Sequence, residues 1–257
     1  MLITTATYGK VHVEVYRTPA EAGGAAAKAA GDHLRTALGR QRQVRALFAA
    51  AVSQLDFLAG LAHEAGVEWS RVEAFQMDEY LGLAAGYPAS FSHWLRRHLF
   101  EAVVPGRVEY MRSDSADPAG ECQRYGELLT ESPIDLGFFG IGENGHLAFN
   151  DPSVADFTDR KAVKVVELDA RSRQQQVNDG AFPDLASVPP RAITVTIPVL
   201  IGCRRVSAVV IGSRKAAAVE RTLRGPITEQ CPASILRGHQ DATIYVDANA
   251  YAALLAT

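Results

Sequence analysis

The chain has 257 residues, of which 47% are hydrophobic and 21% are charged, and its formal net charge is −3. This composition indicates a large packed core and excludes an intrinsically disordered chain. The near-neutral charge gives no reason to expect nucleic acid or an anionic membrane as the main partner. The three cysteines are odd in number and far apart, which argues against a disulfide framework and fits a reducing compartment.

The first 20 residues mix polar residues into every short apolar run, which is typical of neither a signal peptide nor a membrane span. We therefore expect a soluble protein of the cytoplasm. No CxxC or HExxH pattern is present, so we expect no structural zinc site.

Short apolar runs alternate with longer helical patterns along the chain. The expected strands are His12–Tyr16, Arg45–Ala50, Val72–Met77, Val108–Tyr110, Leu136–Ile141, Val163–Leu168, Ala192–Ile197, Ser207–Ile211 and Thr243–Val246. The expected helices are Ala20–Leu38, Leu55–Ala65, Ser90–Phe100, Pro118–Thr130, Lys215–Leu223 and Asn249–Leu255. This alternation predicts an α/β fold with a doubly wound, mostly parallel sheet, formed as one domain over residues 1–257. The polar stretch Asp169–Pro190 is interpreted as a surface excursion within that domain.

Ligands in open parallel sheets bind beyond the carboxyl ends of the strands, so the turns that follow strands are the candidates for a binding site. The first such turn is Met77–Leu83, which contains the adjacent acids Asp78 and Glu79. Because side chains alternate along a strand, one carboxylate can face a cleft while the other turns to the surface or the sheet edge. A solvated turn with an incidental acidic pair remains the alternative.

The second turn is Gly140–Pro152, which follows the most apolar strand. Its glycines allow backbone N–H groups to approach a ligand closely, and His146 is suited to proton transfer near neutral pH. Asn144 and Asp151 can orient the imidazole ring, and Glu143 is near enough to compete. A tight glycine turn with a capping histidine is the structural alternative.

The same turn matches G-x-G-x-x-G, and Glu167 follows at a spacing that suits a dinucleotide site. Two features argue against a dinucleotide site. The turn lies in the middle of the chain, and Pro152 interrupts the helix that would receive the pyrophosphate.

Two further turns carry groups that suit an anion. Gly212-Ser213-Arg214-Lys215 opens a helix after a strand, and Ala51-Val52-Ser53-Gln54 does the same after an earlier strand. Backbone N–H groups at a helix start, a hydroxyl and an ammonium group form a natural phosphate site. Ordinary N-capping by Ser213 and Ser53 is the alternative.

Met77-Asp78-Glu79-Tyr80, Gly145-His146-Leu147-Ala148-Phe149-Asn150 and Gly212-Ser213-Arg214-Lys215 occur here in the order seen in glucosamine-6-phosphate deaminases. The chain resembles that family, also called glucosamine-6-phosphate isomerases and related to the 6-phosphogluconolactonases, from about Val44 to Asp247. The resemblance implies a modified Rossmann-like fold, no dinucleotide or other cofactor, and a sugar phosphate as ligand. It implies conversion of an amino-sugar 6-phosphate and water into fructose 6-phosphate and ammonia.

Carried over by position, Asp78 is implied to shuttle a proton between C2 and C1 of the opened sugar, and His146 to act as the ring-opening acid and base. Asn144, Asp151 and Glu143 are the other residues expected to take part in catalysis. The residues expected to bind substrate are Ser53, Gln54, Glu79, Gly145, Arg173 and Lys215. Family members are often multimeric, so a homo-oligomer stays open.

The sequence departs from the family at several positions. Asn144 stands where the family usually has an aspartate, Asp151 where it has a glutamate, and the loop at Ser53 offers fewer hydroxyl groups. Arg173 is the candidate for an arginine that other members use on the substrate. We hypothesise that Glu143 or Asp151 orients His146 instead of the missing aspartate. These changes leave the hexosamine epimer open.

Three alternative functions remain. A 6-phosphogluconolactonase would use the histidine and the phosphate site but would need no proton shuttle between carbons. A non-catalytic sugar-phosphate sensor is suggested by Asn144 and the reduced phosphate loop. A nicotinamide oxidoreductase is the least favoured.

Overall fold

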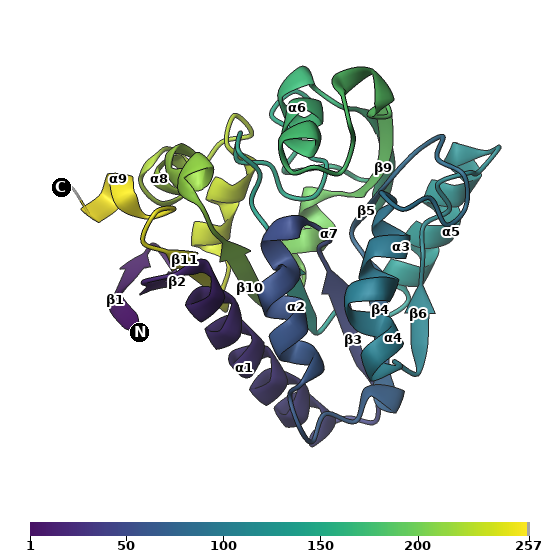
Figure 1. Cartoon of the computed structure of the whole chain (residues 1–257). Coiled ribbons are helices and arrows are strands. Elements are labelled where there is room, and N and C mark those ends of the chain that lie inside the picture. Colours follow the sequence, from purple (N-terminus) through teal and green to yellow (C-terminus); the bar gives the residue numbers. More distant parts are fainter. Residues whose placement is uncertain (256–257) are drawn as a thin grey trace.

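The computed structural model describes residues 1–255 as a mixed sheet covered by helices, with a smaller sheet at one end (Figure 1). The main sheet has eight strands in the order β1-β2-β11-β10-β7-β3-β4-β6. All neighbours in it are parallel except the hairpin of β1 and β2. Its strands are β1 (Leu2–Tyr8), β2 (Val11–Tyr16), β3 (Val44–Phe48), β4 (Val72–Gln76), β6 (Arg107–Glu109), β7 (Leu136–Phe139), β10 (Arg205–Val210) and β11 (Ala242–Asp247).

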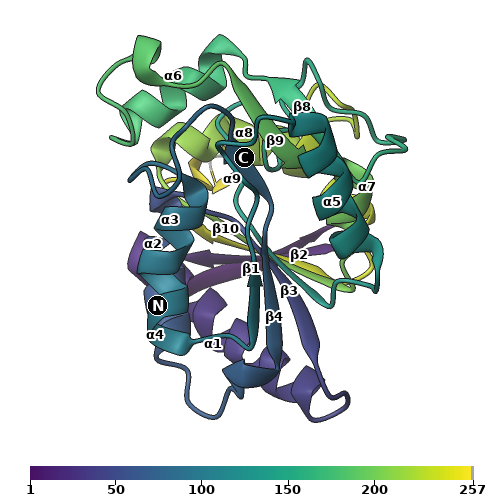
Figure 2. The same ribbon diagram turned by 90° about the vertical axis from the view of Figure 1, so that its right-hand side faces the viewer.

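Helices lie on both faces of this sheet. Figure 2 shows α1, α2 and α3 on one side of the strands, and α5 and α7 on the other. The helices are α1 (Pro19–Leu38), α2 (Leu55–Ala62), α3 (Phe91–Leu95), α4 (Glu101–Val103), α5 (Pro118–Thr130), α6 (Ala170–Asn178), α7 (Ile197–Ile201), α8 (Ala216–Arg224) and α9 (Ala252–Leu255). None of the helices within residues 1–255 is long and apolar enough to cross a bilayer.

Two hydrophobic cores follow from this layering. Successive residues of β3 divide between them, since Phe48 packs with α1 and α2 while Leu47 packs with the side that holds α5. Every residue of β7 is buried, as expected for a strand covered on both faces. The doubly wound α/β fold predicted from the alternation of elements is therefore confirmed.

The smaller sheet is a finding that the sequence did not indicate. β8 (Val163–Glu167) and β9 (Arg191–Val195) form where strands are expected, but they pair antiparallel with each other in a separate sheet. β5 (Asp78–Tyr80) pairs antiparallel with β9 and completes it. The short β5 continues directly from β4, so the chain leaves the main sheet at Met77 and enters the smaller one.

The interpretation of Asp169–Pro190 as a surface excursion is incomplete, because this stretch contains α6. Asp169 caps the helix by accepting a hydrogen bond from the Ser172 N–H at 2.7 Å. The buried side chains of α6 are polar, namely Ser172, Gln175 and Gln176, so the helix has no apolar periodicity to reveal it. α6 lies beyond the end of the main sheet, near the turns that follow its strands (Figure 1).

Candidate active site

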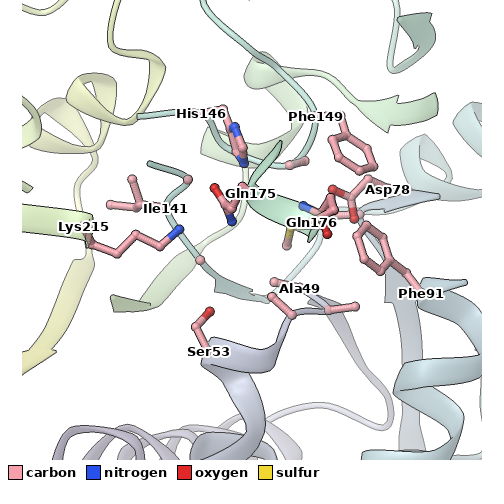
Figure 3. A pocket seen from close by; sticks show the side chains of 16 residues that line it. Ala49, Ser53, Asp78, Phe91, Ile141, His146, Phe149, Gln175, Gln176 and Lys215 are labelled. Carbon is pink, nitrogen blue, oxygen red and sulfur yellow. The ribbon is translucent and has the colours of Figure 1, made fainter. Parts of the chain in front are cut away.

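Turns that follow four neighbouring strands meet at one pocket at the carboxyl edge of the main sheet. The strands β3, β4, β7 and β10 supply Ser53, Asp78, His146 and Lys215 respectively, and all four side chains line the pocket. Figure 3 shows Lys215 and Ser53 on one side of the pocket and Asp78 on the opposite side, with the ring of His146 between them. One small molecule can therefore contact a carboxylate, an imidazole and an ammonium group together.

Asp78 and Glu79 point in different directions because β5 is a regular strand. Asp78 faces the pocket, beside the ring of Phe91. Burial, together with the charge of Glu79, raises the pKa of Asp78 well above its ordinary value. A carboxyl group with a raised pKa is a suitable proton shuttle near neutral pH.

Glu79 does not reach the surface or a sheet edge, as the alternation of side chains suggested, but is fully buried. Its carboxylate accepts hydrogen bonds from the N–H groups of Phe91 at 3.0 Å and Ser92 at 2.9 Å, at the start of α3. Burial raises the pKa of Glu79, although these hydrogen bonds act in the opposite direction. Glu79 thus fixes α3, and with it Phe91, against the pocket, and it is not itself a pocket-lining residue.

The imidazole ring of His146 contacts the buried carboxylate of Asp151 on the side away from the pocket. Its Nδ1 lies 2.9 Å from Oδ1 of Asp151, which is fully buried. Burial alone would raise the pKa of Asp151, but its hydrogen bonds with His146, Asn144 and Ser172 bring the pKa below the ordinary value. Asp151 therefore stays ionised and holds the ring of His146 with its other nitrogen available to a ligand.

Asn144 and Ser172 complete the surroundings of Asp151. Asn144 donates from Nδ2 to Asp151 at 2.8 Å and to Asp169 at 3.2 Å, and its Oδ1 accepts the His146 N–H at 3.0 Å. The Ser172 hydroxyl contacts both Asp151 and the Nδ1 of His146. Of the two carboxylates expected to orient His146, Asp151 is the one in contact, whereas Glu143 pairs with Arg214 at 3.3 Å.

The loop that carries His146 has an unusual backbone. Gly145 has a φ of 92°, and a Cβ at this residue would lie 2.7 Å from Sγ of Cys231. Ala148, a pocket-lining residue, also has a positive φ, of 50°. Asn150 secures the loop by donating to the carbonyl groups of Leu147 and Val195. No helix begins in the segment from Gly140 to Ala162, so the G-x-G-x-x-G pattern does not form a dinucleotide site.

Lys215 and Ser53 both lie at helix starts. Lys215 ends the 3₁₀ turn Ser213–Lys215 before α8, and Ser53 lies in the turn Val52–Gln54 before α2. Neither Ser213 nor Ser53 caps its helix through its side chain, contrary to the capping alternative. Burial lowers the pKa of Lys215 to about 8, although the charges of Asp179 and Glu143 act in the opposite direction. An anion bound here would stabilise the charged form of the amine and lie near the N-termini of two helices.

Several residues expected to bind substrate do not line the pocket. Gln54 is buried and donates to the carbonyl of Val209 at 3.2 Å. Gly145 lies behind His146 and packs on Cys231. Arg173 is directed elsewhere, because its guanidinium donates to the carbonyl groups of Leu185 and Val188.

The pocket residues that the sequence did not indicate come mainly from α6 and from two aromatic side chains. Gln175 and Gln176 line the pocket from α6, and Phe91 and Phe149 form an apolar wall (Figure 3). Asp169 in front of a run of helix-forming residues is a capping signal that identifies α6. A helix that starts there buries Gln175 and Gln176, and it is these two glutamines, not Arg173, that line the pocket.

Comparison with known proteins agrees with this geometry. The family described as glucosamine-6-phosphate isomerases/6-phosphogluconolactonase matches residues 17–245. A glucosamine-6-phosphate deaminase of Listeria welshimeri is 34% identical over 189 residues, which is 74% of this chain and 78% of that protein. The enzyme of the same name from Lactobacillus helveticus is 34% identical over 69% of this chain and 72% of its own length.

Solved structures resemble the whole arrangement. A structure described as a monomeric glucosamine-6-phosphate deaminase has a TM-score of 0.86 at 27% identity, covering 93% of this chain and 98% of that chain. A 6-phosphogluconolactonase from Trypanosoma brucei has a TM-score of 0.79 at 16% identity, covering 98% of this chain and 100% of its own, and so shares the fold.

Proposed function

Because the chain belongs to the glucosamine-6-phosphate isomerase and 6-phosphogluconolactonase family, we propose that it is an enzyme of the deaminase type. In this proposal it converts an amino-sugar 6-phosphate, glucosamine 6-phosphate or an epimer, and water into a ketohexose 6-phosphate and ammonia. The observation that carries the proposal is the position of Asp78 across the pocket from Lys215, with His146 between them (Figure 3).

The phosphate group binds at the Lys215 end. The amine of Lys215 is buried and has no hydrogen-bond or ion-pair partner within residues 1–255, so a dianionic phosphate is a suitable counter-charge. The Ser53 hydroxyl and the two helix starts add donors. The phosphate is remote from the carbons that react, so its binding can position C1 and C2 of the sugar next to Asp78.

His146 opens the sugar ring. With Nδ1 directed to Asp151, the other ring nitrogen can deliver a proton to the ring oxygen as the C1–O bond breaks. That nitrogen takes up the proton of the C1 hydroxyl in the same step, so the proton passes from the hydroxyl through His146 to the ring oxygen and the product is the open-chain aldehyde. Asp151 stabilises the charged imidazole, as a buried carboxylate does behind other catalytic histidines.

Asp78 then moves a proton between adjacent carbons. It removes the proton from C2 of the open-chain ammonium sugar while the nitrogen supplies a proton to the C1 oxygen, which gives a neutral enolamine. Asp78 returns its proton to C1, and the product is an iminium ion at C2. Water adds to C2 and ammonium leaves, so one water is consumed for each ammonium released. A carboxyl group whose pKa is raised by burial suits both the removal and the return of the proton.

Ammonia release from a panel of amino-sugar 6-phosphates tests the proposal, with 6-phosphogluconolactone as the competing substrate. We expect ammonia from at least one hexosamine phosphate, and loss of that activity in Asp78→Asn with the melting temperature retained. Hydrolysis of the lactone without ammonia release would support the lactonase instead. Ligand-dependent melting without turnover of any substrate would identify a sensor.

A further inference from the structure

Gln176 is a largely buried side chain whose amide has no partner in the part of the chain that the structure describes. It lies on α6 and is only 8% exposed, yet its side-chain nitrogen and oxygen form no hydrogen bond within residues 1–255. It lines the pocket that contains Asp78 and Lys215. In Figure 3 it extends into the pocket on the same side as Asp78, opposite Lys215.

The neighbouring glutamines of α6 are already engaged. Gln175 accepts a hydrogen bond from the Glu143 N–H at 3.1 Å and approaches Asp179 at 3.4 Å. Gln174 is exposed on the other face of the helix and donates to Asn178 at 3.1 Å. Gln176 therefore differs from both, because its amide lies at the pocket and is free to contact a ligand.

The amide of Gln176 opens onto the pocket and has no hydrogen-bond partner within residues 1–255, so a ligand bound there can supply it with both a donor and an acceptor. A sugar hydroxyl supplies both, whereas a phosphate offers only acceptors in its ionised form. Building on the function proposed above, the carbons that lie between the phosphate at Lys215 and the reacting end at Asp78 are C3, C4 and C5. Gln176 lies on the Asp78 side, nearest to the carbons next to C2.

We propose that Gln176 is a specificity-determining residue that binds the hydroxyl on C3 or C4 of the open-chain hexosamine phosphate. Its neutral amide can both donate a hydrogen bond to this hydroxyl and accept one from it, provided that the configuration at that carbon points the hydroxyl toward Gln176. An epimer that directs this hydroxyl elsewhere leaves the amide unpaired in the complex, which is a strong basis for discrimination. Gln176 would thus determine which hexosamine epimer binds, although it takes no part in proton transfer.

The test measures binding, so that it does not depend on turnover. The probes are 2-amino-2-deoxyglucitol 6-phosphate, an open-chain compound without a carbonyl group, and its 3-deoxy and 4-deoxy analogues. Their dissociation constants are measured by calorimetry for the wild type, Gln176→Met and the matched control Gln174→Met. We expect Gln176→Met to weaken binding of the parent compound by roughly 10- to 100-fold, and Gln174→Met to leave it unchanged.

The decisive result is the coupling between the side chain and one hydroxyl. We expect one deoxy analogue to bind the wild type as weakly as the parent binds Gln176→Met, and to lose nothing more in that variant. Independent losses for both analogues, or parent binding unaffected by Gln176→Met, would overturn the proposal. A protein that binds these compounds but releases no ammonia from any hexosamine phosphate would contradict the proposed deaminase activity alone.

Discussion

His146 and Asp151 are joined by a contact of 2.9 Å between Nδ1 and Oδ1, and Asp151 has no exposed surface. The same Oδ1 also receives the amide of Asn144 and the hydroxyl of Ser172. The carboxylate therefore accepts hydrogen bonds from three side chains, and its second oxygen has no partner among residues 1–255. Its role is to hold the imidazole in one orientation, with the proton on Nδ1 when the ring is neutral.

Replacing Asp151 tests this orientation. In Asp151→Asn the new side chain can turn its amide N–H toward Nδ1, which would move the ring proton to the nitrogen that faces the pocket. We expect kcat to fall by roughly 10²- to 10⁴-fold with little change in KM. Steady-state kinetics of ammonia release measure this, and circular dichroism controls for folding. An unchanged rate and pH profile would rule out Asp151 as the residue that orients His146.

Ser172 is a second test of the same network, at a residue that the sequence did not indicate. Ser172→Ala removes one donor to Asp151 and one contact to His146, but it leaves the hydrogen bond between Asp151 and His146 in place. We expect a moderate effect, with kcat about 10-fold lower and KM unchanged. The pKa of Asp151 should rise, because one of the hydrogen bonds that lower it is lost. Ser172→Thr, which keeps the hydroxyl, should recover part of the rate, and an equal loss in both variants would indicate a packing role.

Most of the main sheet and its longer helices could be predicted because their signals are local, although β1 and α7 were not expected. β7 is an apolar run, and the helix α1 has a capping box formed by Thr18 and Glu21, so neither depends on distant residues. The smaller sheet could not be predicted in the same way. β5 is three residues long, and its pairing with β9 depends on the chain turning out of the main sheet at Met77.

The residues of the candidate site likewise fall into those that the sequence could predict and those that it could not. Asp78, His146 and Lys215 follow strands of one sheet, so the carboxyl-edge rule brings them together once the fold is known. Gln175, Gln176 and Ser172 come from a helix with a polar buried face, whose burial is set by the pocket and not by an apolar pattern. Arg173 was the candidate counterpart of an arginine that other family members use on the substrate, but its guanidinium donates to the carbonyl groups of Leu185 and Val188 instead.

Glu79 influences Asp78 through its charge. Burial and, to a smaller extent, the charge of Glu79 raise the pKa of Asp78, and Glu79→Gln removes the second of these causes, so this pKa should fall. Because the ionised form of Asp78 takes the proton from C2, activity increases as pH rises through this pKa. We therefore expect the acidic limb of the kcat/KM profile to move to lower pH in the variant.

The same substitution should also destabilise the protein. A glutamine can place only one oxygen toward the donors of Tyr80, Phe91, Ser92 and Gln76 that now surround the carboxylate. We expect the free energy of unfolding to fall by about 1–3 kcal/mol in chemical denaturation. An acidic limb at the wild-type position, in a variant that remains folded, would show that Glu79 does not tune Asp78.

Lys215 is expected to stabilise the complex and destabilise the free protein. Its pKa in the fold is about 8, below the ordinary value of 10.5. Below pH 8 the amine is charged in both states and the folded state bears the full cost of its burial, on the order of 3 kcal/mol. Between pH 8 and 10.5 the unfolded chain binds more protons than the fold does, so the stability of the wild type should rise with pH in this range.

Lys215→Met separates these two effects. The variant should unfold at a higher temperature than the wild type at pH 7, and its advantage should shrink as pH rises above 8. Inorganic phosphate should raise the melting temperature of the wild type but not of the variant, and the effect on the wild type should weaken above pH 8, where the free amine loses its proton. Thermal melts with and without phosphate at pH 7 and pH 9 measure both trends. A variant that phosphate stabilises as much as the wild type would remove Lys215 from the phosphate site and leave the helix starts and Ser53 as its remaining donors.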